Sequence, residues 1–153
     1  MLRYHSYNIV FQEVPDELTL AINLSNCPNG CKGCHSPYLQ TDTGNELTVE
    51  VMDALLANYG EAISCLCFMG GDADPVGVEQ LAVYVKNSYP TLKIAWYSGK
   101  QSFPDDLSIE NFDYLKLGSY IEKLGGLNKP TTNQRFYKIE KGQRIDCTYR
   151  FQQ

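Results

Sequence analysis

The chain has 153 residues, of which 43% are apolar and 20% are charged, and this size and composition indicate one compact domain over residues 1–153. Its 13 Lys and Arg against 18 Asp and Glu give a formal charge of -5 without a basic cluster, so we expect no nucleic-acid partner, because phosphate binding needs positive surface. No apolar run is long enough for a signal peptide or a membrane span, so we expect a cytoplasmic protein.

Segments that predict strands alternate with segments that predict helices. Residues 18–24 (LTLAINL) have the pattern of a strand. Residues 48–60 predict a helix with Thr48 as its N-cap, apolar residues at helical spacing and Gly60 at its end. The elements expected after it are a strand at 62–69, a helix at 78–89 stopped by Pro90, a strand at 92–97, a short helical piece at 104–112 and a strand at 112–118.

Strands that alternate with helices of this length indicate βαβ units around a parallel sheet. A closed eight-fold barrel takes about 250 residues, so this chain can supply only part of one. We therefore expect an α/β fold that is an open partial (β/α) barrel, with a mostly parallel sheet and a lateral opening. The working loops of such sheets follow the carboxyl ends of the strands, and a cysteine-rich loop follows the strand at 18–24 in that position.

Three of the six cysteines, Cys27, Cys31 and Cys34, lie close together with the spacing C-x3-C-x2-C. In a reducing compartment, such thiols indicate metal ligands or catalytic groups rather than disulfide partners. A structural zinc ion takes four protein ligands, whereas an iron-sulfur cubane held by three cysteines leaves one iron with an open coordination position. A substrate or cofactor can bind at that open position.

The residues that could supply a fourth ligand are His35, Cys65, Cys67 and Cys147. His35 directly follows the third cysteine, which makes it an awkward ligand for the same metal, and the other three lie far off in sequence. A zinc site built from the three cysteines and a distant fourth is the alternative interpretation, and a disulfide is a weaker one. Cys65 and Cys67 are two apart on an expected strand, so they share a face, where we expect them to pack in the core.

The cysteine spacing, with the aromatic His35 directly after the third cysteine, resembles the cluster-binding signature of the radical S-adenosylmethionine (SAM) enzymes. Gly70, Gly71 and Asp72 follow the next expected strand and match the glycine-glycine-acid element with which this superfamily holds the methionine part of SAM. Glycine suits this task because it lets the backbone approach a ligand closely, and an acidic group can pair with the ammonium of the ligand.

The resemblance implies a 4Fe-4S cluster bound by Cys27, Cys31 and Cys34, with SAM on the open iron. The stretch WYSGK (96–100) matches a short glycine-containing element near the nucleoside end of SAM, which implies a cofactor contact for Ser98. No catalytic residue beyond the cluster ligands is implied. The full set of implied cofactor-binding residues is Gly33, Cys34, His35, Gly70, Gly71, Asp72 and Ser98.

Residues 112–142, which include NQRFYKI, are similar to the carboxyl-terminal part of the activating proteins of anaerobic (class III) ribonucleoside-triphosphate reductase, and the similarity extends over nearly the whole chain. The resemblance implies a radical SAM oxidoreductase whose cluster is reduced by a flavodoxin-type donor and passes one electron to SAM. The resulting 5'-deoxyadenosyl radical would abstract a hydrogen from a backbone glycine of the large reductase subunit. The alternatives are an activase of another glycyl radical enzyme and a non-catalytic zinc or iron-sulfur binding module.

Overall fold

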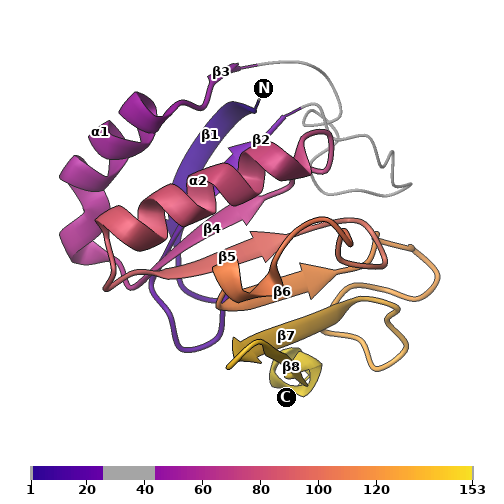
Figure 1. Ribbon diagram of the computed structural model, residues 1–153. Helices are drawn as coiled ribbons and strands as arrows, with labels where there is room; N and C mark the ends of the chain where they lie inside the picture. Colours follow the sequence, from indigo (N-terminus) through magenta and orange to yellow (C-terminus); the bar gives the residue numbers. More distant parts are fainter. Residues whose placement is uncertain (1, 26–43, 153) are drawn as a thin grey trace.

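A computed structural model describes residues 2–25 and 44–152. In this part of the chain, two α-helices and short 3-10 helices accompany one eight-stranded sheet (Figure 1). In chain order the elements are β1 (Arg3–Val10), β2 (Thr19–Leu24), β3 (Asn45–Glu46), α1 (Val49–Tyr59), η2 (Gly60–Ala62), β4 (Cys65–Met69), α2 (Pro75–Ser88), β5 (Lys93–Tyr97), η3 (Ile109–Asn111), β6 (Tyr114–Leu117), β7 (Arg135–Glu140), β8 (Gln143–Asp146) and η4 (Thr148–Phe151).

The strands follow the order β3-β1-β2-β4-β5-β6-β7-β8. At the centre, β2, β4, β5 and β6 are parallel to one another, as the βαβ pattern predicts. On both sides of this centre the pairs β3–β1, β1–β2, β6–β7 and β7–β8 are antiparallel. The described sheet is open and α/β in character, as expected, but it is mixed rather than mostly parallel.

The strands that the sequence patterns did not reveal lie toward the edges of the sheet. No residue of β1 is fully buried, and all four residues of β8 are exposed, so neither strand has the apolar run of a core strand. Backbone pairing with a neighbouring strand satisfies their hydrogen bonds without needing such a run. The expected strand at 18–24 is therefore the second strand of the chain.

Helix α1 forms where the sequence predicts it. The Thr48 hydroxyl accepts a hydrogen bond from the backbone N–H of Val51 at 3.2 Å, which satisfies one of the unpaired donors of the first turn. The helix ends at Tyr59 with Gly60 as its C-cap, and the 3-10 helix η2 follows directly. Because η2 occupies the start of the expected strand at 62–69, β4 begins only at Cys65.

Helix α2 begins at Pro75, three residues before the position that apolar spacing indicates. The Asp74 carboxylate accepts a hydrogen bond from the N–H of Gly77 at 3.1 Å, and Pro75 suits the first helical position because its missing N–H would be unpaired there. The helix ends at Ser88, before Pro90, as expected. Within the described ranges, no helix is both long and apolar enough to span a membrane.

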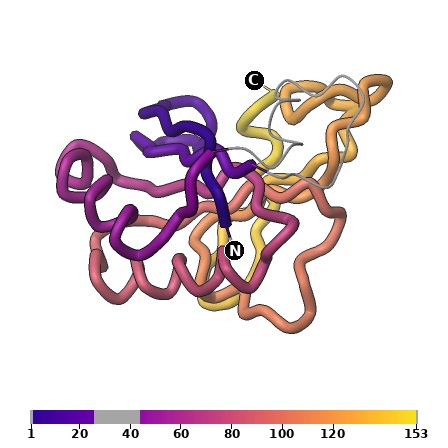
Figure 2. Tube along the Cα trace, turned by 90° about the horizontal axis from the view of Figure 1, so that it is seen from above, coloured from indigo at the N-terminus to yellow at the C-terminus, as the bar shows by residue number. Residues whose placement is uncertain are grey.

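Both α-helices cover the same face of the sheet and bury the larger core against it (Figure 1). Seen from above, the helices lie on one side of the sheet and the C-terminus on the other (Figure 2). Trp96 of β5 is fully buried in this core. The centroid of its ring lies 5.4 Å from the ring centroid of Phe112 and 6.0 Å from that of Phe103. The other fully buried large side chains of this core are Leu20, Ile22, Leu24, Met52, Leu66, Phe68, Ile94 and Leu115.

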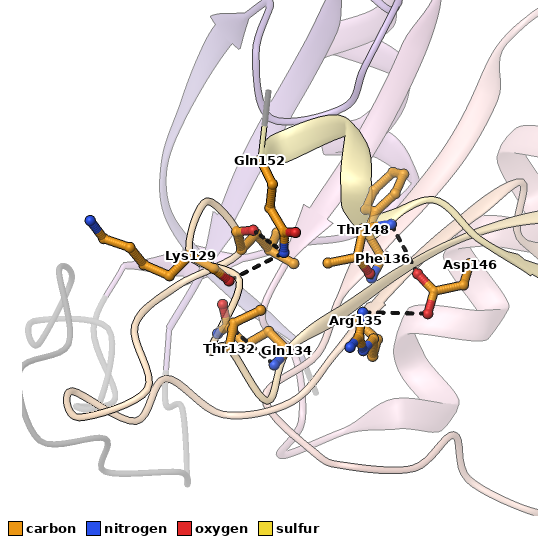
Figure 3. Close-up of polar contacts among 9 residues, drawn as sticks. Lys129, Thr132, Gln134, Arg135, Phe136, Asp146, Thr148 and Gln152 are labelled. Carbon is orange, nitrogen blue, oxygen red and sulfur yellow. Dashed lines mark hydrogen bonds and ion pairs between the residues drawn. The ribbon is translucent and has the colours of Figure 1, made fainter.

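The opposite face of the sheet carries a smaller core. Its buried members are Val14, Cys65, Cys67, Ala95, Tyr114 and Phe136. The C-terminal segment covers part of this core and is fastened by polar contacts (Figure 3). The Thr148 hydroxyl accepts from the N–H of Phe136 at 2.9 Å, and the Gln152 amide donates to the carbonyls of Leu127 and Lys129 at 3.3 and 3.2 Å.

Candidate functional site

The carboxyl ends of the four parallel strands meet at one edge of the sheet. Asn23 of β2 lies in register with Met69 of β4, which pairs with Tyr97 of β5, which in turn pairs with Lys116 of β6. The chain therefore leaves these strands at the same level, and ligand sites in open α/β sheets lie beyond this edge. We call it the carboxyl edge.

The segment with Cys27, Cys31 and Cys34 begins at the carboxyl edge. Its residues, including Gly33 and His35, lie outside the described part of the chain, so their roles stay predictions. Ser25, the last described residue before the segment, directly follows β2, and its backbone N–H donates to the carbonyl of Arg3 at 2.9 Å. This bond ties the residue that follows β2 to the start of β1, the neighbouring strand.

The turn after β4 is built on two consecutive glycines with positive φ, +101° at Gly70 and +94° at Gly71. L side chains rarely adopt this conformation. A Cβ on Gly71 would also lie 2.6 Å from Cγ2 of Val78 and 2.9 Å from Cδ1 of Leu24. The Gly-Gly pair that the sequence analysis assigned to close approach of a ligand is thus required by the backbone itself.

Strand β5 holds both backbone groups of Gly70. The N–H of Gly70 donates to the carbonyl of Tyr97 at 2.9 Å, and Nε1 of Trp96 donates to the carbonyl of Gly70 at 2.7 Å. The indole of Trp96 is fully buried among aromatic rings, which fixes the direction of its N–H. Sequence analysis missed this contact, because a tryptophan in an apolar strand indicates packing. It does not indicate a hydrogen bond to a turn 26 residues earlier in the chain.

Asp72 completes the turn, and its carboxylate points to the end of β5. Oδ1 accepts from the Ser98 hydroxyl at 2.5 Å, and Oδ2 accepts from the N–H of Gly99 at 2.8 Å. The side chain is largely buried, and the first distance lies at the short end of the range for O–H to carboxylate hydrogen bonds. The structure thus brings Gly70, Asp72 and Ser98 together at the carboxyl edge.

Ser98 sits below this surface, because only 1% of the residue is exposed. Its hydroxyl donates to Asp72 and accepts from the N–H of Lys100 at 3.1 Å. The ammonium of Lys116 donates to the carbonyls of Ser98 at 3.3 Å and Gly118 at 2.7 Å, which ties the ends of β5 and β6 together. The sequence suggested either a ligand contact or a solvated strand charge for Lys116, and the structure shows its ammonium bonded to these two carbonyls.

A cavity of about 600 Å³ opens at the same edge, beyond the end of β6. Its described lining consists of four consecutive residues, Tyr120, Ile121, Glu122 and Lys123. Ile121 is 40% exposed, so the wall offers apolar as well as charged groups. The lining residues follow β6 in the chain, and the described lining does not include Asp72, Ser98 or Lys116.

The amino ends of the parallel strands are closed on the smaller-core side. The loop between β1 and β2 inserts Val14, which is fully buried. The Tyr114 hydroxyl donates to Glu17 of this loop at 2.9 Å, and Arg150 of η4 pairs with Asp16 through two hydrogen bonds of 2.8 and 2.9 Å. In the described residues, the loop between β1 and β2 therefore covers the smaller core at the amino ends of the strands, and the expected lateral opening stays a prediction.

Cys65 and Cys67 share a face of β4, as predicted, and both are fully buried in the smaller core. Burial raises the pKa of the Cys65 thiol to about 12 and raises that of Cys67 well above its ordinary value. A metal ligand must be a thiolate, which such burial disfavours. Across residues 2–25 and 44–152, no three His, Cys, Asp or Glu side chains are grouped so that they could hold a metal ion. The described cysteines therefore pack as core residues.

This packing predicts a pattern of thiol reactivity. With a pKa of about 12, only about one Cys65 thiol in 10,000 is ionised to the thiolate at pH 8. Burial also blocks access of the reagent, so iodoacetamide should leave Cys65 and Cys67 unmodified in the folded protein. Cys147 is half-buried and should react first of these three. Peptide mass spectrometry after a timed reaction measures this order, and denatured protein is the control in which all three react. Rapid native labelling of Cys65 would contradict the buried packing.

The fold and the edge described above define an α/β protein with an open mixed sheet and polar turns gathered at the carboxyl ends of its parallel strands. The chain belongs to the family of 4Fe-4S single cluster domains, whose model matches residues 18–123. A 4Fe-4S cluster-binding domain is thereby indicated, and the match includes the cysteine segment and both turns of the carboxyl edge. Comparison with the curated proteins and with the solved structures finds no match.

Proposed function

We propose that the protein is a radical SAM activating enzyme that generates a glycyl radical on the large subunit of an anaerobic ribonucleoside-triphosphate reductase. The observation that carries the proposal is that three segments leave adjacent parallel strands at the carboxyl edge. The cysteine segment starts at Ser25, the Gly-Gly-Asp turn follows β4, and Ser98 follows β5. Membership of the 4Fe-4S single cluster family supplies the cofactor class.

The proposed cluster ligands are Cys27, Cys31 and Cys34. The family match spans residues 18–123, which contain two further cysteines, Cys65 and Cys67. Both of those thiols are buried in the sheet with raised pKa values, so they are poor ligands. This supports ligation by the three clustered cysteines, which leaves one iron open for a substrate or cofactor.

The chain's own residues would bind and orient SAM beside that iron. Gly70 and Gly71 offer a backbone without side chains, and Asp72 supplies the acidic group proposed to attract the ammonium of SAM. When bound, the cluster and SAM together supply one-electron cleavage of the sulfonium to methionine and a 5'-deoxyadenosyl radical. The protein contributes orientation and exclusion of water, which is the usual division of labour in cofactor enzymes.

The proposed substrate is a glycine-containing loop of the large reductase subunit. Val14 and its neighbours fill the smaller core at the amino end of the strands, which supports an approach of the loop from the carboxyl edge. The cavity beside Tyr120–Lys123 opens there. We further propose a flavodoxin-type electron donor and a cytoplasmic location, because both fit an oxygen-sensitive cluster in a reducing compartment.

The deciding experiment is SAM cleavage by protein reconstituted with iron and sulfide under anaerobic conditions. With dithionite as reductant, we expect 5'-deoxyadenosine and methionine in equal amounts, and no cleavage without reductant. Adding the large reductase subunit should produce a glycyl radical signal in electron paramagnetic resonance. A signal only with a different glycyl radical enzyme would move the assignment to that partner. A colourless preparation with one zinc per chain and no cleavage would instead identify a non-catalytic zinc module.

A further inference from the structure

The turn that carries Asp72 is tethered at both of its ends to four consecutive residues of β5 and its exit. Gly70 is held by Trp96 and Tyr97, and Asp72 is held by Ser98 and Gly99. The four hydrogen bonds measure 2.7, 2.9, 2.5 and 2.8 Å. The turn after β4 is therefore docked on β5.

The Ser98 hydroxyl has one proton, and that proton is directed at Asp72. The same oxygen accepts from the N–H of Lys100, and the residue is only 1% exposed. A hydroxyl in this arrangement has no second proton to give to a ligand. Its chemical effect on the carboxyl edge is to fix the direction of the Asp72 carboxylate.

From this geometry we propose that Ser98 is a positioning residue that acts through Asp72 and does not itself contact the cofactor. The inference rests on the proposed function, because it concerns the site that would hold the methionine part of SAM. It replaces the nucleoside contact that the sequence resemblance implies for Ser98 with a different role. The proposed cofactor site is then built from two strands, because the segment after β4 supplies the turn and β5 with its exit holds that turn in place.

The role can be measured as equilibrium binding of radiolabelled SAM to anaerobically reconstituted protein, which does not depend on turnover. Ser98→Ala should weaken SAM binding about tenfold, the effect of losing one hydrogen bond to a charged group. Ser98→Thr retains a hydroxyl donor and should restore most of this binding. Ser102→Ala is the matched control, because Ser102 is an exposed serine in the same connection between β5 and β6, and it should bind SAM as the unaltered protein does.

A double-mutant cycle tests whether Ser98 works through Asp72. The melting temperatures of the reconstituted Ser98→Ala, Asp72→Ala and doubly substituted proteins should be non-additive, with the double variant melting close to Asp72→Ala alone. Additive losses would overturn the proposal, because Ser98 would then act independently of Asp72. Unweakened SAM binding by a folded Ser98→Ala protein would overturn it as well.

These outcomes are distinguishable from failure of the proposed function. If the unaltered, cluster-loaded protein binds no SAM, then the radical SAM assignment fails whatever the variants do. If the unaltered protein binds SAM and Ser98→Ala binds it equally well, only the positioning role fails. The cycle of melting temperatures reports the Ser98–Asp72 contact in either case, since it needs no SAM.

Discussion

Under the proposed function, replacing any one of Cys27, Cys31 or Cys34 with Ala should abolish SAM cleavage, with a loss of at least about 1,000-fold in rate, because the cofactor and not a side chain would perform the bond cleavage. A cubane that loses one of three thiolate ligands has an additional open iron and is readily lost from the protein. The brown colour and the iron content after anaerobic reconstitution should fall together with the cleavage rate. Both are measured on the same preparation.

Cys147→Ala is the matched control for these three substitutions. Cys147 is a half-buried thiol that packs at the margin of the smaller core, outside the family match at residues 18–123. Its replacement should retain the cluster and SAM cleavage within about twofold, because Ala keeps an apolar group at a partly exposed site. If a Cys27, Cys31 or Cys34 variant keeps full iron content and cleavage, then the ligand assignment is wrong.

Gly71→Ala should cause the largest loss of stability among single substitutions at the carboxyl edge. The positive φ of Gly71 costs an L residue roughly 1–2 kcal/mol, and the overlap of the new Cβ with Val78 and Leu24 adds about 1–3 kcal/mol. Val78 and Leu24 are both buried, so neither can move aside without disturbing the larger core. A total near 3 kcal/mol lowers the melting temperature of a chain of this size by about 10 °C.

Gly60→Ala provides the comparison, because Gly60 has a φ of -58° and the nearest atom to its new Cβ would be Cβ of Leu56 at 3.7 Å. This substitution should leave the melting temperature unchanged or raise it slightly, since Ala reduces the entropy of the unfolded chain. Thermal unfolding of the reconstituted proteins at one scan rate measures both. Equal melting temperatures for Gly71→Ala and the unaltered protein would mean that the turn adopts a different conformation from the one described here.

The two substitutions at glycine also separate stability from binding. Gly71→Ala moves the turn that carries Asp72, so SAM binding should weaken even at temperatures where the variant is folded. Gly60 lies at the end of α1, shortly before the amino end of β4, so it is on the side of the sheet away from the carboxyl edge. Gly60→Ala should therefore not affect SAM binding. A variant that melts early but binds SAM normally at low temperature would argue against a role of the Gly-Gly turn in the cofactor site.

The central elements of the fold could be predicted because their side chains carry the information locally. Apolar runs marked β2, β4, β5 and β6, and helical spacing with the Thr48 cap marked α1. The antiparallel strands could not be found in the same way. β1 and β8 are held by backbone pairing and have no buried residue, so local apolar patterns did not mark them, and the sheet proved mixed where a mostly parallel one was expected.

The sequence by itself determined the kinds of chemical group present: a cluster of thiols after one strand, and glycines with an acid after the next. Only the tertiary structure decided how those groups are held, because hydrogen bonds such as Ser98 to Asp72 and Trp96 to Gly70 join residues 26 positions apart in the chain. Local patterns reflect the conformational preferences of neighbouring residues, whereas the parallel register of β4 and β5 arises from burial over the whole sheet. That register brings the two turns to one edge, where Ser98 can fix the direction of the Asp72 carboxylate.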